Sequence, residues 1–187
     1  MEEKELAVRA KNGSKEAFEL LMRRYQKGLY NYIYRLTGQR DLAVDFTQEA
    51  FLKAYLSIDK YNPSYNFSTW LWRIAHNLVV DHFRKGKLNQ VSLQMGKEGE
   101  EAEYEVESRD PGPYEKHLNR ERKRIIMAAL EKLPPQLREL IVLRHFQELS
   151  YQEISQVTGL AFHEVKSKLF RAREKLRKIL EAYREAL

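Results

Sequence analysis

A basic segment near the C-terminus has the residue types and spacing of a DNA-reading helix. Ser150 and Glu153 fit a capping box at the start of one helix, Gly159 ends that helix, and a basic helix follows over about residues 162–183. The second helix of a helix-turn-helix enters the major groove, where Lys and Arg meet phosphates or guanine, Ser bonds either, and Phe contacts thymine methyls. The outward side chains are Lys166, Ser167, Lys168, Phe170 and Arg171. The pattern favours DNA binding over an ordinary solvated basic helix.

A second cluster mixes aromatic and basic side chains between residues 61 and 87. Its members are Tyr61, Tyr65, Phe67, Trp70, Trp72, Arg73, His76, Asn77, Arg84, Lys85 and Lys87. Exposed aromatic rings stack on unpaired bases for roughly 1–3 kcal/mol each, while cations follow the phosphate backbone. The cluster is therefore consistent with binding of single-stranded or flipped bases. The alternative is that the two tryptophans belong to the core.

Catalytic and metal-binding chemistry has little support in the sequence. His76, Asp81 and His82 are spaced five and six residues apart, which does not place them well on one helix face. Zinc spacings, a Walker loop and a nucleophile elbow are missing, and the chain has no cysteine. A nuclease lacks a carboxylate cluster for metal ions. We therefore expect no enzyme, no metal, no cofactor and no small-molecule substrate.

The elements that hold the aromatic cluster are predicted to be helices of an N-terminal bundle. Apolar residues recur every three or four positions from Phe18 to Leu36, and Gly38 supplies a left-handed cap. A second helix is predicted over about residues 41–58. A loop over residues 59–67 then leads to a third helix, with Ser68 as its N-cap.

The elements that hold the basic segment form a second small bundle. A helix over about residues 120–133 stops at Pro134 and Pro135, and another covers residues 136–146. The two helices flanking Gly159 are expected to pack together through apolar side chains. These are Ile154, Val157, Leu160, Val165 and Leu169. The predicted fold class is all-α, with two small helical domains.

Charge is segregated along the 187 residues, although the formal net charge is only +6. Residues 164–184 carry eight basic and three acidic side chains, whereas residues 97–110 carry seven acidic and two basic ones. We expect domains at residues 1–87 and 120–187, joined by an acidic flexible linker over residues 88–119. The longest apolar run, residues 125–130, is far shorter than the roughly 20 residues that span a bilayer, so we expect a cytoplasmic protein.

Two stretches resemble the extracytoplasmic-function (ECF) group of bacterial RNA polymerase sigma factors. One comprises DLAVDFTQEAFLKAY at residues 41–55 and FSTWLWRIAHN at residues 67–77. The other comprises LPPQLRE at residues 133–139, LSYQEI at residues 149–154 and VKSKLFRAR at residues 165–173. The resemblance implies a two-domain sigma factor that binds core polymerase and helps open promoter DNA.

The resemblance also implies three sets of contact residues. Contact with core polymerase, at the β′ clamp helices, would involve Asp45, Gln48, Glu49 and Phe51. Contact with the −10 element would involve Tyr61, Phe67, Trp70, Trp72, Arg73, His76, Asn77 and Arg84. Contact with the −35 element would involve Lys166, Ser167, Lys168, Phe170, Arg171 and Arg173.

Further partners follow from the same resemblance. They are the polymerase β subunit, promoter DNA and an anti-sigma factor, which in this family is often anchored in the membrane. The chain departs from the family at Ala161, Phe162, His163 and Glu164, where members often have Pro-x-Gly-Thr before the recognition helix. The competing interpretation is a free-standing helix-turn-helix regulator. It shares the C-terminal features but leaves the aromatic loop and the helix at residues 45–51 unexplained.

Overall fold

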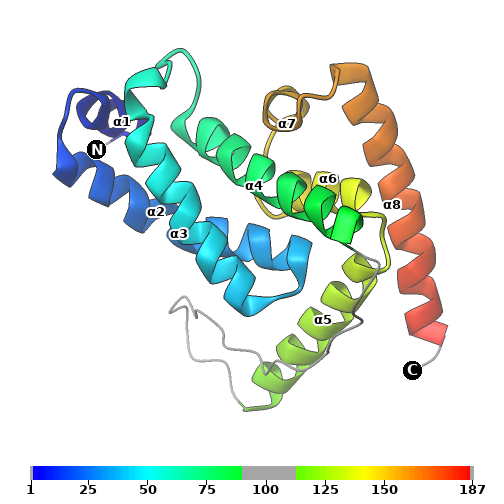
Figure 1. The fold of residues 1–187 in the computed structure, drawn as a ribbon. Helices are drawn as coiled ribbons and strands as arrows, with labels where there is room; N and C mark the ends of the chain where they lie inside the picture. The colour runs from blue at the N-terminus through cyan, green and yellow to red at the C-terminus, as the bar shows by residue number, and fades with distance from the viewer. Residues whose placement is uncertain (1, 90–112, 186–187) are drawn as a thin grey trace.

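The N-terminal half of the protein is a bundle of four α-helices. A computed structural model of the chain describes the backbone of residues 2–89 and 113–185, and most side chains within those ranges. The helices are α1 (Glu3–Lys11), α2 (Lys15–Thr37), α3 (Arg40–Leu56) and α4 (Phe67–Asn89), with a 3-10 turn η1 (Ile58–Lys60) after α3. Figure 1 shows α2 and α3 lying alongside each other, with α1 across one end.

Local sequence signals explain where several of these helices begin and end. Gly38 adopts the left-handed conformation (φ 69°) after α2, as predicted, and its amide bonds the carbonyl of Tyr34. The start of α4 differs from the prediction that Ser68 caps it, because the helix begins at Phe67 and Ser68 lies in its first turn. The Ser68 amide instead donates to Glu3 Oε1 of α1 at 2.9 Å. A carboxylate from another helix therefore satisfies an N-terminal amide of α4.

The C-terminal half consists of α5 (Pro113–Glu131), α6 (Pro135–His145), α7 (Tyr151–Thr158) and α8 (Phe162–Glu185). The capping box is confirmed: the Glu153 amide donates to Ser150 Oγ, and the Ser150 amide donates to Glu153 Oε2. Gly159 is left-handed (φ 74°), which allows the tight turn between α7 and α8. Four of the five predicted packing residues are buried and Leu160 is half-buried, so the helix-turn-helix is confirmed.

One helix begins inside the segment that was predicted to be linker. The prediction placed the start at about residue 120, whereas α5 begins at Pro113. Proline suits the first turn of a helix because its φ is already helical and its missing N–H needs no partner there. At the other end of the predicted linker, residues 88 and 89 belong to α4, and residues 90–112 lie outside the described residues.

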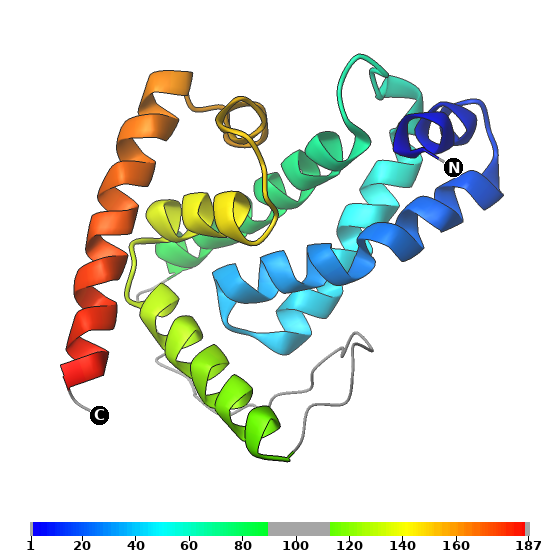
Figure 2. The same cartoon turned by 180° about the vertical axis from the view of Figure 1, so that it is seen from behind.

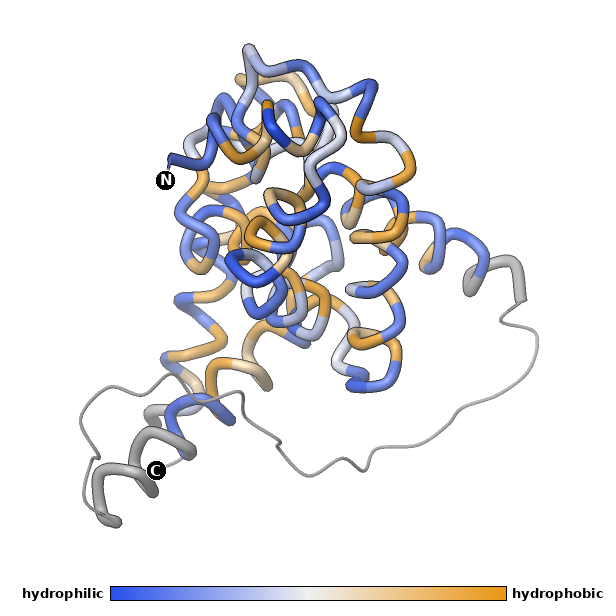
Figure 3. The backbone as a smooth tube through the Cα atoms, turned by 90° about the vertical axis from the view of Figure 1, so that its left-hand side faces the viewer, coloured by the Kyte–Doolittle hydropathy of each residue, from blue (hydrophilic) through white to orange (hydrophobic). Residues whose placement is uncertain are grey.

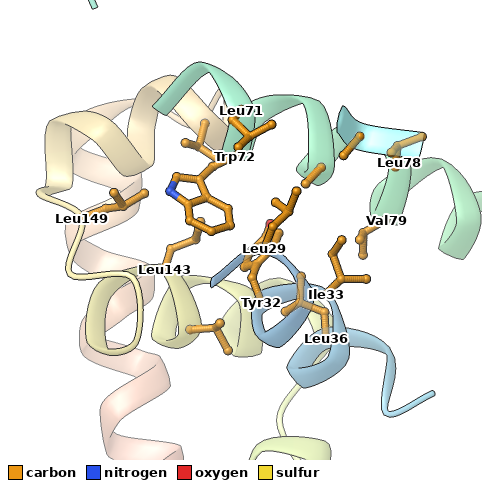
Figure 4. Close-up of a cluster of buried hydrophobic side chains, with 14 of the residues drawn as sticks. Leu29, Tyr32, Ile33, Leu36, Leu71, Trp72, Leu78, Val79, Leu143 and Leu149 are labelled. Carbon is orange, nitrogen blue, oxygen red and sulfur yellow. The ribbon is translucent and has the colours of Figure 1, made fainter. Parts of the chain in front are cut away.

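The two halves pack against each other in one continuous core. Helix α7 lies against α4 and α6 lies against α2, and the view from behind shows α6 between α4 and α8 (Figure 2). Figure 4 shows Trp72 of α4 close to Leu143 and Leu149, with Tyr32 of α2 nearby. The rings of Tyr32 and Trp72 are 5.5 Å apart. The apolar faces of the helices supply this core, and Figure 3 shows hydrophobic and hydrophilic residues interleaved along them.

Candidate nucleic-acid and protein interfaces

Helix α3 positions the residues predicted to bind a protein partner. Asp45 and Gln48 are exposed, and Glu49 pairs with Lys53 at 3.0 Å. Phe51 is different, because its side chain is only 5% exposed and packs in the core. Phe51 therefore packs α3 onto the core. In this conformation its side chain is not available to contact a partner protein.

Sequence reasoning missed an apolar stripe on the outer face of α3. The stripe consists of exposed side chains at helical spacing: Val44, Leu52, Tyr55 and Leu56. Leu56 is 71% exposed. The spacing of positions 44, 52 and 56 was visible in the sequence, but no apolar surface was predicted on the outer face of this helix. An exposed apolar stripe that also carries the polar side chains of Asp45 and Gln48 is typical of a protein-binding surface.

The exposed face of α4 carries part of the predicted −10 set. Arg73, Asn77 and Arg84 follow one another along this face at spacings of four and seven residues, and all three are exposed. Arg84 pairs with Asp81 at 3.0 Å across a solvent-exposed turn. Exposed pairs of this kind are weak and exchange readily for phosphate contacts.

The aromatic part of the predicted −10 set lies mainly in the core. Tyr61, Phe67 and Trp72 are at most 3% exposed, and Tyr61 donates a hydrogen bond to the Tyr65 carbonyl. Burial raises the pKa of Tyr61. Trp70 is half-buried and leans on Tyr61 and Phe67, with ring centroids 5.4 and 5.6 Å away. The expectation that exposed rings stack on bases therefore does not match Tyr61, Phe67 and Trp72, because all three rings are buried in the core in this conformation.

His76 belongs to a polar cluster between α4 and α6 that the sequence did not indicate. Its Nδ1 lies 2.6 Å from Glu139 Oε1 of α6, and the Tyr32 hydroxyl donates to the same oxygen at 2.5 Å. Desolvation by burial, together with the nearby Glu139 carboxylate, raises the pKa of Tyr32 well above its usual value. The two partners of Glu139 are 107 and 63 residues distant in sequence, so no local pattern could have found this cluster.

Helix α8 presents the predicted −35 residues outward. Lys166, Ser167, Phe170, Arg171 and Arg173 are all exposed, and Phe170 reaches 68%. Lys168 is half-buried and donates to Gln136 Oε1 of α6 at 2.9 Å. An open hollow of about 430 Å³ lies between α6 and α8 beside Phe170 and Arg171.

The electrostatic environment at α8 is positive. Burial lowers the pKa of His145, and the neighbouring Arg173 and Arg144 lower it further. The N-terminus of α8 lacks the usual capping residue, but Glu164 Oε2 accepts from the Ala161 amide at 2.9 Å. This half of a capping box orders the entry to the helix at the position where the sequence departs from the sigma factors that it resembles. Phe162 is half-exposed there, 6.2 Å from the Tyr151 ring.

Known families match both halves of the chain. Sigma-70 region 2 matches residues 21–88, and Sigma-70 region 4 matches residues 123–176. Within the described residues, no helix is both long and apolar enough to cross a membrane.

Curated relatives match almost the full length. The chain is 35% identical to the ECF RNA polymerase sigma factor SigW of Bacillus subtilis (strain 168), over 91% of this chain and 92% of SigW. It is 34% identical to the ECF RNA polymerase sigma-E factor of Escherichia coli (strain K12), over 90% of this chain and 89% of that factor.

Solved structures share the fold. CnrH in complex with the cytosolic domain of CnrY superposes with a TM-score of 0.72 at 25% identity, covering 96% of this chain and 97% of CnrH. The sigma factor RpoE of Bartonella quintana, solved with the anti-sigma factor NepR, has a TM-score of 0.70 at 22% identity, covering 88% of this chain and 96% of RpoE. Two matching regions in this order, with full-length relatives above 30% identity, show that the chain belongs to the ECF family of RNA polymerase sigma factors.

Proposed function

We propose that the two halves of this sigma factor divide its work, with residues 1–87 binding core polymerase and the −10 element and residues 120–187 reading the −35 element. The observation that carries the proposal is the exposed stripe on α3, where Leu52 and Leu56 lie on the same helix face as the exposed Asp45 and Gln48. An exposed apolar stripe is typical of a protein-binding surface, and a polymerase subunit needs such a surface. We assign this stripe to the β′ clamp helices.

The promoter contacts are assigned to two helices. On α4 the cations Arg73 and Arg84, with Asn77 between them, are suited to track and read an opened strand. On α8 the exposed Lys166, Ser167 and Arg171 are suited to base edges and phosphates in the major groove, and Phe170 to a thymine methyl. The remaining contact with polymerase is assigned to the C-terminal half and the β subunit.

A regulatory protein partner is part of the same proposal. CnrH, which shares the fold, was solved with the cytosolic domain of CnrY. By analogy, an anti-sigma factor would cover the α3 stripe of this chain, and a membrane anchor on that partner would hold the complex at the inner membrane. We infer that the chain acts in the cytoplasm, without catalysis of its own, because its family works on RNA polymerase and DNA.

The first experiment is co-elution of the pure protein with bacterial core RNA polymerase on a sizing column at moderate salt. We expect a stoichiometric complex that initiates transcription at a defined promoter. Elution of the protein alone, with retained binding to duplex DNA, would favour the free-standing regulator instead.

A further inference from the structure

Helix α1 precedes the segment that matches Sigma-70 region 2, which begins at residue 21. It packs against α2, α4 and η1, and Figure 1 shows it at the end of α3 where the chain turns toward α4. Its buried face includes Ala7 and Ala10. Two charged side chains, Glu3 and Lys11, share that face, because positions i, i+4, i+7 and i+8 lie on one side of a helix. These two residues are here called the brace.

Glu3 attaches α1 to the start of α4. Its Oε1 accepts from the Ser68 amide at 2.9 Å, and its Oε2 accepts from the Tyr25 hydroxyl of α2 at 2.5 Å. The Ser68 amide is one of those at a helix N-terminus that have no partner within the helix, and a carboxylate there also interacts favourably with the helix dipole. Burial, together with the hydrogen bond to Glu3, raises the pKa of Tyr25. One carboxylate therefore joins three helices.

Lys11 holds the other end of the loop that leads into α4. Its Nζ donates to the Tyr61 carbonyl at 2.6 Å, at the residue where the chain leaves η1. Tyr61 then orders the loop from within, because its hydroxyl donates to the Tyr65 carbonyl at 2.6 Å. The Tyr65 amide donates to the Asn62 carbonyl at 3.1 Å. Hydrogen bonds from a charged donor are roughly twice as strong as neutral ones, so Lys11 is a strong tie between α1 and the loop.

Between these two anchors the loop presents polar and aromatic groups to solvent. Asn62, Ser64 and Tyr65 are exposed, and the side chain of Tyr65 is 51% exposed. The loop leads directly into α4, whose exposed face is assigned to the −10 element. A recognition surface is precise only when the residues beneath it are held by packing and hydrogen bonds. The small side chains of α1 supply the packing, and the brace supplies hydrogen bonds at both ends of the loop.

We propose that Glu3 and Lys11 are positioning residues for promoter recognition, which hold residues 61–66 in the conformation that receives the opened −10 strand. The proposal rests on the assignment of the N-terminal half to the −10 element. A loop already held in its binding conformation loses less conformational entropy when it binds, and it rejects wrong bases because it cannot adjust to them. Helix α1 thus contributes selectivity at the −10 element without touching DNA.

The first test measures the loop itself and needs neither polymerase nor promoter. Lys11→Met removes the ammonium group but keeps a long side chain, and Lys4→Met makes the same change at an exposed position of α1. Hydrogen exchange of the full chain reports on the amides of Tyr61 and Tyr65, which both donate to backbone carbonyls. We expect these amides to exchange about fivefold faster in Lys11→Met than in Lys4→Met, with the amides of α8 unchanged. Equal exchange in the two variants would overturn the brace, and so would faster exchange throughout the chain, which is the effect of general destabilisation.

The second test measures selectivity in the holoenzyme. A barcoded promoter library, randomised at the −10 and −35 elements, is transcribed in vitro with each variant, and the transcripts are sequenced. We expect Lys11→Met and Glu3→Gln to lower the preference for the best −10 sequences about fivefold, while the −35 preference and co-elution with core polymerase stay unchanged. Lys4→Met and Glu5→Gln are the matched controls, because both change exposed charges of α1.

The two elements of the library separate the outcomes. An unchanged −10 preference in Lys11→Met and Glu3→Gln would refute the positioning role. Equal loss of preference at both elements would refute it as well, because a loop brace acts on the −10 element alone. If the unmodified holoenzyme shows no preference at the −10 positions, the assignment of the N-terminal half to that element is wrong, whereas hydrogen exchange still decides whether the brace orders the loop.

Discussion

Two arginines of α8 illustrate how position decides what a side chain can do. Arg177 donates to Glu181 at 2.7 Å and to Glu174 at 3.2 Å, and these contacts raise its pKa. Arg171 is exposed on the face shared with Lys166 and Ser167, and has no ion pair with another described residue. Arg171 is therefore available for DNA, whereas Arg177 is already engaged with its own helix.

Replacing Arg171 tests the −35 assignment at one residue. We expect Arg171→Ala to reduce −35-dependent initiation by about 5- to 100-fold, which corresponds to a lost base contact of roughly 1–3 kcal/mol. Binding to core polymerase should be unchanged, because Arg171 lies far along the chain from the α3 stripe. The measurements are run-off transcription and co-elution with polymerase. Arg177→Ala is the matched control, and equal loss of both activities in Arg171→Ala would contradict the assignment.

The sequence predicted the exposure of some single side chains correctly and of others incorrectly. The outward face of α8 followed from helical periodicity, because Val165, Leu169 and Ala172 occupy the inward positions. The burial of Tyr61 and Phe67 was not predicted, since an aromatic ring has the same identity in a core as on a binding loop. The burial of Glu139 could not be predicted from nearby residues, because the partners of this carboxylate come from the other half of the chain.

At the scale of an element, the capping box sets where α7 begins. Ser150→Ala removes the hydroxyl that accepts from the Glu153 amide at 3.2 Å. We expect the free energy of unfolding to fall by about 1 kcal/mol, the usual effect of losing an N-cap. Chemical denaturation measures it. Ser167→Ala is the control, because that hydroxyl only donates back to the Glu164 carbonyl within α8. No loss in Ser150→Ala would mean that the cap does not stabilise α7.

Glu153 makes the same helix sensitive to acid. Its partial burial raises the pKa, but hydrogen bonds from Ser150, Asn66 and Thr69 outweigh this and lower the pKa below its usual 4.5. A lowered pKa stabilises the folded chain fully above about pH 4.5, and this stabilisation disappears as pH falls through the folded value. We expect the wild-type chain to lose more stability than Glu153→Gln between pH 7 and pH 3. Parallel pH profiles in denaturant titrations would contradict this.

The stripe on α3 makes a prediction of its own. Leu56→Asp places a charge on a side chain that is 71% exposed, so folding should change by less than about 0.5 kcal/mol. The affinity for core polymerase, measured by co-elution over a series of concentrations, should fall at least tenfold, because the new charge must be desolvated in an apolar contact. Ile126→Asp on α5, which is also exposed, is the control. Normal polymerase binding by Leu56→Asp would remove the stripe from the interface.

Helices were the most predictable level of structure. Gly38, Gly159, Pro134 and the capping box are strong local signals, and the helix ends near them were correct within one or two residues. The start of α5 at Pro113 was missed although proline is a local signal, whereas two other features have non-local causes. The start of α4 is set by a carboxylate from α1, and the packing of α7 on α4 depends on contacts between residues more than 80 positions apart.

At the scale of the whole molecule, two features oppose DNA binding by the free chain. The acidic residues 97–110 reduce the net positive charge with which the chain attracts phosphates. The packing of the two halves also keeps His76 and Trp72 away from any strand. The acidic charge and the covered side chains both favour weak DNA binding by the free chain.

We therefore expect the isolated chain to bind a promoter duplex weakly, with a Kd of about 1 µM or higher at physiological salt, as for non-specific binding. The holoenzyme should bind the same duplex at least 100-fold more tightly, since it adds base contacts on both elements to the phosphate contacts. Fluorescence anisotropy with labelled duplex measures both affinities, and the salt dependence of each reports the number of phosphates contacted. A duplex with a scrambled −35 element is the control for specificity. Nanomolar binding by the isolated chain would mean that its recognition surfaces are available to duplex DNA without polymerase, and would contradict this expectation.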